Sequence, residues 1–292
     1  MNITAAMVKD LRTKTGAGMM DCKKALVEAE GDMEKAVDIL REKGLSQAAK
    51  KASRVAAEGT VVFAMSDDKK VGALLEVNCE TDFVGSNEDF RSLASAIAEQ
   101  IIKINPADVE ALLASDMNGK TVKEQVTEAV AKIGENISVR RFTRYESADG
   151  AVYSYIHGGG KIGVLVEMTG GDDELGKDVA MQVAAANPSY LNRTEVPQAE
   201  LEHEKEVLAV EARNEGKPEK IIEKMVIGRI NKYYKEVCLV DQEFIKDSDL
   251  TISKLLKSKG AEVLRFTRYQ LGEGIEKKQD DLAAEVAKQL NQ

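Results

Sequence analysis

The most informative hydrophobic pattern runs from Val71 to Val84, with the sequence VGALLEVNCETDFV. Apolar residues at every second position from Val71 to Val77 predict a strand with one apolar face. The segment then becomes polar and ends with an acid beside an aromatic residue, Asp82 and Phe83. Two interpretations of this pair stay open. Either the strand presents it as a binding tip, or Phe83 packs onto the next helix, which an S-x-x-D capping signal predicts from Ser86.

Residues 4 to 44 predict a small module of three short helices. The third helix has its apolar residues at helical spacing and is expected to end at Gly44; these residues are Met33, Ala36, Val37 and Leu40. Met19 and Met20 are expected in the glycine-rich loop between the first two helices. Packing against the module's core is expected for one of them, and the other is left open as an adaptable apolar contact.

An internal duplication determines the predicted architecture of the central region. Residues 59–78, GTVVFAMSDDKKVGALLEVN, align without a gap with residues 150–169, GAVYSYIHGGGKIGVLVEMT. Farther along, VRRFTRY at 139–145 recurs as VLRFTRY at 263–269. Both copies therefore predict a β-hairpin, then helix, then a final strand.

The second copy is longer than the first by about 33 residues. The extra segment fits Thr194 to Glu236, which predicts an antiparallel helical hairpin around a turn at residues 216–218. Its apolar stripe is thin, which favours a hairpin that projects from the domain over one that lies flat on the core. A last amphipathic helix is expected after Gly274, either capping the core or docking on a partner.

These patterns predict an α+β fold in several modules. The predicted boundaries are 1–55 for the three-helix domain, 56–146 for the first core repeat, 147–192 with 237–273 for the second repeat, 193–236 for the inserted helical hairpin, and 274–292 for the C-terminal helix.

Composition narrows the classes of function. The formal charge of −9 argues against a dedicated nucleic-acid binder, because phosphate contacts need clustered positive charge. Three widely spaced cysteines, Cys22, Cys79 and Cys238, suggest neither disulfides nor a metal site and favour a reduced, cytoplasmic setting. No leader peptide and no apolar run long enough to span a membrane is visible in the sequence.

The candidate enzyme motifs do not meet their structural requirements. The glycines of residues 158–163 match G-x-G-x-x-G, but they fall within a predicted hairpin instead of preceding a helix. Lys161 lacks the leading glycine and following hydroxyl of a phosphate-binding loop. The two histidines, His157 and His203, have no evident nucleophile beside them, and Cys79 has no setting that would lower its pKa. We therefore expect neither enzymatic activity nor a cofactor.

Two longer motifs resemble a known family. LRTKTGAGMMDCKKAL at 11–26 and EVNCETDFV at 76–84 are similar to the signature stretches of bacterial translation elongation factor Ts, and AKIGENISVRR at 131–141 and HGGGKIGVLVE at 157–167 look like further family segments. The similarity spans the chain in order. Gly85 and Ser86 depart from the family pattern, which usually has a residue such as Ala or Ser followed by a basic or amide residue, and Lys161 replaces a frequent arginine.

The resemblance implies a guanine nucleotide exchange factor for the GTPase elongation factor Tu. It also implies an N-terminal module similar to ubiquitin-associated domains, a duplicated α+β core, a coiled-coil hairpin and a C-terminal helix. In the family, the turn that corresponds to Thr81–Val84 inserts between helices of the GTPase and disturbs its magnesium site. The implied partner is therefore a protein, with neither nucleic acid nor membrane, and a homodimer within a 2:2 complex is left open.

The site residues follow by motif from the same resemblance. Those implied at the magnesium site of the GTPase are Thr81, Asp82, Phe83 and Val84, and the weaker contact candidates are Lys23, Ile133, Gly134 and His157. Two other classes of function remain as alternatives. One is a non-catalytic peptide-binding or chaperone-like interaction protein, and the other is a thiol enzyme that uses Cys79.

Overall fold

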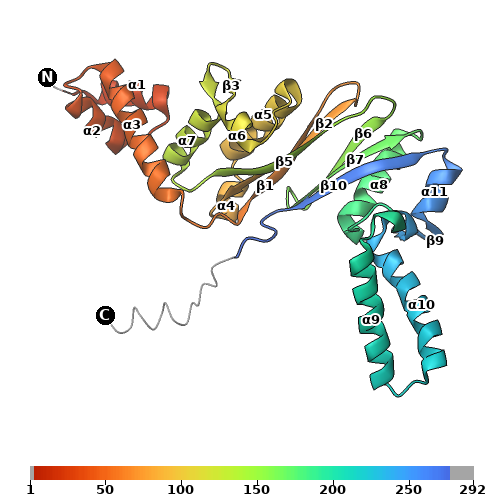
Figure 1. Ribbon diagram of the computed structural model, residues 1–292. Coiled ribbons are helices and arrows are strands. Elements are labelled where there is room, and N and C mark those ends of the chain that lie inside the picture. Colours follow the sequence, from red (N-terminus) through yellow and green to blue (C-terminus); the bar gives the residue numbers. More distant parts are fainter. Residues whose placement is uncertain (1–2, 277–292) are drawn as a thin grey trace, which may run out of the picture. The chain divides into compact units, whose positions relative to one another are not determined.

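The computed structural model describes residues 3–276 and shows a mixed helix-and-strand fold, in agreement with the α+β prediction (Figure 1). The described chain forms two compact units. The first holds residues 3–62, 75–142 and 270–276, and the second holds 63–74 and 143–269. Most of the predicted C-terminal helix, from residue 277 on, lies outside the described residues.

The first unit begins with three helices, α1 (Ala5–Thr15), α2 (Met19–Glu28) and α3 (Met33–Lys51). Side chains cap α1 and α3: Thr4 accepts a hydrogen bond from the backbone N–H of Met7, and Asp32 accepts from those of Glu34 and Lys35. Between the helices lies a small apolar cluster, which includes Leu11, Cys22, Ala25, Leu26 and Ala36.

Two local predictions in this module are wrong. Gly44 does not end the third helix, because α3 continues through it to Lys51. A Cβ added at Gly44 would lie 3.1 Å from the Cβ of Ala131, so the glycine lets α3 approach α7 (Val122–Ile133) closely. Met19 and Met20 form the first turn of α2 instead of a loop, and they are 58% and 63% exposed, so neither packs in the core.

Both copies of the duplication form three-stranded sheets with the same strand order. The first sheet is β1–β2–β5, with bounds Glu58–Met65, Val71–Cys79 and Ser138–Glu146. The second is β6–β7–β10, with bounds Ala151–His157, Ile162–Thr169 and Glu262–Gln270. In each, a hairpin supplies two neighbouring strands and the later F-T-R-Y strand completes the sheet. The predicted repeat of hairpin, helix and strand is confirmed.

The interval between β2 and β5 carries the helices of the first copy. They are α4 (Asp82–Gly85), α5 (Glu88–Ile104), α6 (Val109–Ala114) and α7, with a small hairpin of β3 (Asp116–Met117) and β4 (Lys120–Thr121). The predicted cap of α5 is wrong by one residue. Asn87 accepts the N–H of Phe90 at 3.2 Å, whereas Ser86 closes α4 by donating its own N–H to Asp82.

The second copy packs α8 (Asp173–Ala186) against β6 and β7 over a core that includes Val164, Val166, Val179 and Val183. The remaining elements of the second unit are η1 (Arg193–Glu195), α9 (Gln198–Asn214), α10 (Glu219–Val237), η2 (Leu239–Asp241), β8 (Glu243–Phe244), β9 (Asp247–Thr251) and α11 (Ile252–Ser258). Figure 1 shows α9 and α10 side by side, extending away from the sheet of their own unit. A thin apolar stripe is typical of such an arrangement.

A buried carboxylate pairs with arginine at the same place in both repeats. Glu76 in β2 is fully buried, and its oxygens accept from Arg141 at 2.6 Å, from Arg140 at 2.9 Å and from the N–H of Gly272 at 2.9 Å. The equivalent Glu167 in β7 accepts from Arg265 at 2.5 Å. Burial raises the pKa of Glu76, but the hydrogen bonds from Gly272 and the two arginines outweigh it, so the net pKa is lowered.

We predict that Glu76→Ala lowers the free energy of unfolding by about 2 to 4 kcal/mol, because it removes the shared acceptor of two guanidinium groups. The matched change Glu167→Ala removes one arginine contact and should cost less. Urea denaturation followed by circular dichroism measures both. Equal midpoints for wild type and Glu76→Ala would refute this role.

Because the pKa of Glu76 is lowered in the folded chain, its contribution to the free energy of unfolding depends on pH. Its stabilisation is complete above the unfolded pKa of about 4.3 and is lost as the pH falls through the lower folded pKa. The difference in stability between wild type and Glu76→Gln should therefore shrink as the pH falls through that window. A difference that stays constant with pH would contradict the assignment.

Candidate functional site

The Asp82–Phe83 pair lies in a one-turn helix directly after the central strand of the first sheet. β2 ends at Cys79, and Thr81 caps α4 by accepting the N–H of Val84 at 3.4 Å. Phe83 is 86% exposed, more than any other large hydrophobic side chain in the described part of the chain, and Asp82 is exposed beside it. A ring in that position does not pack onto the next helix, so the packing interpretation of Phe83 is wrong. The pair is presented to solvent.

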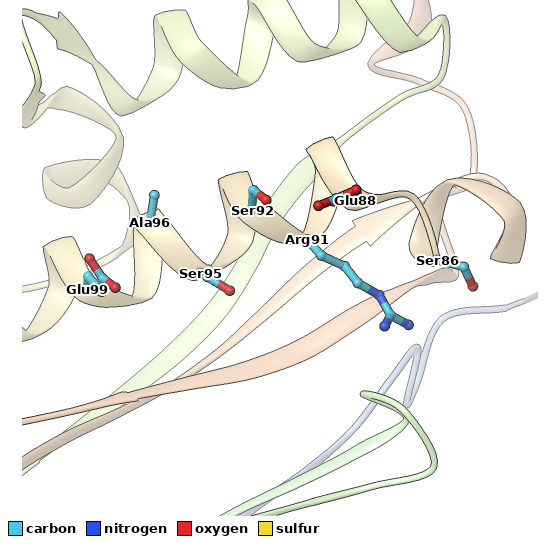
Figure 2. A pocket seen from close by; sticks show the side chains of 7 residues that line it. All are labelled: Ser86, Glu88, Arg91, Ser92, Ser95, Ala96 and Glu99. Carbon is cyan, nitrogen blue, oxygen red and sulfur yellow. The ribbon is translucent and has the colours of Figure 1, made fainter.

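Close backbone packing fixes the end of α4. A Cβ added at Gly85 would lie 2.7 Å from the carbonyl oxygen of Gly59, so the absence of a side chain lets α4 rest on the start of β1. From α5, Arg91 donates to the carbonyl oxygen of Gly85 at 3.0 Å. Figure 2 shows its side chain extending from α5 toward the segment that carries Ser86. Gly85, a departure from the family pattern, thus has a packing reason in this chain.

A hollow of about 550 Å³ lies along the outward face of α5 and reaches Ser86, the residue after α4 (Figure 2). Most of its lining side chains are small or acidic: Ser86, Glu88, Arg91, Ser92, Ser95, Ala96 and Glu99. Its lining offers no cluster of groups for chemistry. It has the character of a contact surface.

Sequence reasoning missed Glu135, which holds the N-terminal side of α4. Its carboxylate accepts the N–H groups of Glu80 and Thr81 at 3.1 and 3.0 Å and the hydroxyl of Thr81 at 2.6 Å. The neighbouring residues Ile133 and Gly134 were predicted as contacts. A carboxylate directly after the glycine that ends a helix was the available signal, but its partners lie 54 and 55 residues away in sequence.

The first unit brings two of the predicted site segments into one network. Gly134 ends α7 in the left-handed conformation with φ of 90° and is exposed, and Ile133 before it is half-buried. Through Glu135 this turn is hydrogen-bonded to Thr81. Ile133 and Gly134, which were predicted as contacts, therefore lie directly before the residue that holds α4, the helix that carries Phe83.

Two further candidates lie elsewhere. Lys23 is exposed on α2, one helical turn from Met19 and one from Val27, both of which are 58% exposed. His157 is exposed at the end of β6 in the second unit, where its Nδ1 lies 3.2 Å from the hydroxyl of Tyr155. Both side chains are accessible to a partner.

The thiol of Cys79 does not suit catalysis. It is fully buried and donates to the carbonyl oxygen of Thr81 at 3.1 Å. Burial, together with the charge of Glu135, raises its pKa to about 12, so the reactive thiolate is scarce at neutral pH. The thiol-enzyme alternative therefore lacks an activated nucleophile at this residue.

The remaining motifs are structural. Gly158, Gly159 and Gly160 have positive φ and form the turn between β6 and β7, so no helix follows to receive a phosphate.

Within residues 3–276, no group of three or more His, Cys, Asp or Glu side chains is placed to hold a metal ion. None of the helices in the described part is both long and apolar enough to cross a membrane.

An exposed aromatic ring and an acid on a braced α+β core form a surface that another macromolecule can contact. The sequence profile described as Elongation factor TS matches residues 80–273. Elongation factor Ts of Clostridium perfringens (strain 13 / Type A) is 56% identical, with 98% of each chain covered. Those of Clostridium acetobutylicum and Thioalkalivibrio sulfidiphilus are 55% and 53% identical, with 99% coverage of each chain.

The chain belongs to the elongation factor Ts family. The predicted recognition is thereby confirmed. Membership implies a nucleotide exchange factor for elongation factor Tu, which acts in the elongation phase of protein biosynthesis.

The buried thiol generates a direct prediction. Iodoacetamide should alkylate Cys79 at least about 100-fold more slowly in the folded chain than in urea, because the folded thiol is inaccessible and its pKa is raised to about 12. Peptide mass analysis of timed samples at pH 8 separates Cys79 from Cys22 and Cys238. Equal labelling rates in both states would reopen the thiol-enzyme alternative.

Proposed function

We propose that the chain is a guanine nucleotide exchange factor that promotes GDP release from elongation factor Tu by inserting the Thr81–Val84 turn near the magnesium site of the GTPase. It acts in the cytoplasm by binding alone, without a chemical reaction of its own. The observation that carries the proposal is the 86% exposure of Phe83 on a braced one-turn helix. A phenyl ring exposed to this extent gains free energy when a partner buries it.

Phe83 supplies a definite share of the binding energy. Complete burial of the ring in the partner contributes about 1.5 to 3 kcal/mol, which corresponds to roughly one to two decades in affinity. The tip therefore acts as a wedge, and other contacts must supply the rest of the affinity.

Asp82 places a carboxylate beside the ring of Phe83 on α4. In P-loop GTPases a hydroxyl and a carboxylate hold magnesium near the phosphates, so a competing charge and an inserted ring disturb the groups that support the metal. An exchange factor must bind the nucleotide-free GTPase more tightly than the loaded one. By linkage, nucleotide then weakens the binding of the factor by the same ratio.

Further contacts extend the interface. The exposed side chains of Met19, Met20 and Val27 surround Lys23 on α2 and form a mixed apolar and basic surface. Ile133 and Gly134 lie at the turn that supports Thr81, and His157 adds an accessible aromatic contact from the second unit. Adaptable methionines and a cation suit a protein partner.

The finer architecture belongs to the same proposal. We propose that α1 to α3 form a module like a ubiquitin-associated domain, that α9 and α10 pair as a coiled coil, and that the boundaries predicted at 55, 146, 192, 236 and 273 separate the functional modules. The partner is a protein and neither nucleic acid nor membrane. A homodimer within a 2:2 complex is compatible with this interface.

Phe83→Ala should lower the rate of fluorescent GDP release at subsaturating factor by roughly 10- to 100-fold, because the wedge loses its apolar ring. Asp82→Ala should also slow release, and the double variant should slow it most. The control is Phe63→Ala, which truncates another partly exposed phenylalanine, 44% exposed, and should leave release unchanged. Full activity of the double variant would disprove the wedge, and no acceleration by wild type would favour a peptide-binding protein.

Lys23→Ala should weaken binding roughly threefold to tenfold while the release rate at saturating factor stays near that of wild type, because the α2 surface contributes affinity and does not reach the metal. Titration of the factor in the same release assay separates the two quantities. Lys35→Ala, an exposed lysine on α3, is the matched control. A lower plateau rate with an unchanged half-saturation point would contradict this division.

A further inference from the structure

Two carboxylates, those of Glu80 and Glu135, each accept backbone N–H groups from the other's segment of the chain. Glu135 accepts the N–H groups of Glu80 and Thr81 at 3.1 and 3.0 Å and the Thr81 hydroxyl at 2.6 Å. In return, Glu80 accepts the N–H of Asn136 at 2.6 Å. We call Glu80, Thr81, Glu135 and Asn136 the carboxylate clamp. All four residues lie in the first unit.

The clamp satisfies donors that no strand or helix satisfies. β2 ends at Cys79 and α4 begins at Asp82, so the N–H groups of Glu80 and Thr81 lie between the two elements. Backbone donors in such a position need another acceptor, and an ionised carboxylate is a strong one. Glu135 therefore fixes the course of the chain at the point where it leaves the sheet.

The effect reaches α4 through Thr81. Its hydroxyl donates to Glu135 and accepts the N–H of Val84, so one side chain joins the clamp to the first turn of the helix. A helix of four residues does not form by itself in water. The direction of Phe83, the second residue of α4, thus depends on where Glu135 holds Thr81.

A third segment braces the clamp. Arg54 lies 3.4 Å from the same oxygen of Glu80, and the side chain of Asn136 donates to the carbonyl oxygen of Arg54 at 2.8 Å. These bonds join the end of the N-terminal module, the end of β2 and the turn after Gly134. Three segments far apart in the sequence are thus joined by hydrogen bonds among Arg54, Glu80 and Asn136.

We infer that Glu135 is a positioning residue for nucleotide exchange. It holds α4 in its binding conformation and joins it to the Ile133–Gly134 turn, so that both meet the GTPase as one rigid surface. Rigidity of this kind lowers the entropy lost on binding. The inference rests on the proposed exchange function and assigns Glu135 no contact with the nucleotide or the metal.

Three substitutions separate hydrogen-bond geometry from charge. Glu135→Gln keeps an oxygen for the two N–H groups and offers an amide N–H to the Thr81 hydroxyl, so its exchange efficiency should stay within about twofold of wild type. Glu135→Asp keeps the charge but is one methylene shorter, and Glu135→Ala removes the acceptor. Both should lose roughly tenfold, the equivalent of one lost hydrogen bond. Fluorescent GDP release at subsaturating factor measures all three.

Hydrogen exchange on the free chain tests the clamp without the partner. Amide exchange at Glu80 and Thr81 should be at least roughly tenfold faster in Glu135→Ala and Glu135→Asp, and close to wild type in Glu135→Gln. Glu110→Ala, an exposed glutamate on α6, is the control for loss of one negative charge. Thermal melting monitors the fold, and if Glu135→Ala does not fold, the Gln and Asp variants decide.

The outcomes are distinguishable. If Glu135→Asp matches wild type in both GDP release and amide protection, the reach of the side chain to the two N–H groups does not matter, and the inference is overturned. If every Glu135 variant is as active as wild type while Phe83→Ala is slow, the exchange function stands and the positioning role falls. If wild type does not accelerate release, the proposed function fails and the positioning role with it, whatever protection the amides show.

Discussion

A helix of four residues does not hold its own shape in water, and this constraint governs how the chain presents Phe83. α4 depends on its neighbours: Glu135 fixes Thr81 on one side, and Gly85 rests against Gly59 on the other. These contacts hold both ends of α4, and the phenyl ring of Phe83 between them is exposed to solvent. The conformation of the tip thus depends on residues outside the T-D-F-V sequence.

Carboxylates perform a similar structural task in both repeats. Glu76 collects two arginines and the N–H of Gly272, and Glu167 binds Arg265 at the equivalent place in the second sheet. Apolar packing holds helices on sheets, whereas charged acceptors fix the places where strands meet later segments of the chain. A factor that acts by binding needs this rigidity, since disorder in its contact surface would weaken its hold on the partner.

The sequence predicts the duplicated core well, because the repeated hairpin and the F-T-R-Y strand keep their residue patterns. It fails where distant contacts override local signals. Gly44 looks like a helix end, but it lies inside α3, where the missing side chain allows a close approach to Ala131. The local sequence allows Phe83 either to form a binding tip or to pack on the next helix. The contact of Gly85 with Gly59 joins residues far apart in the sequence, so the local pattern does not reveal it. Glu135 acts across more than fifty residues, so no periodicity reveals it.

In the proposed mechanism, the Asp82–Phe83 tip and the magnesium of the GTPase oppose each other. The most direct test measures the affinity of the chain for elongation factor Tu at fixed GDP while free magnesium is varied, for wild type and for the chain carrying both Asp82→Ala and Phe83→Ala. Linkage predicts that magnesium weakens wild-type binding steeply and the double variant's binding much less. Equal magnesium dependence in the two chains would contradict the account.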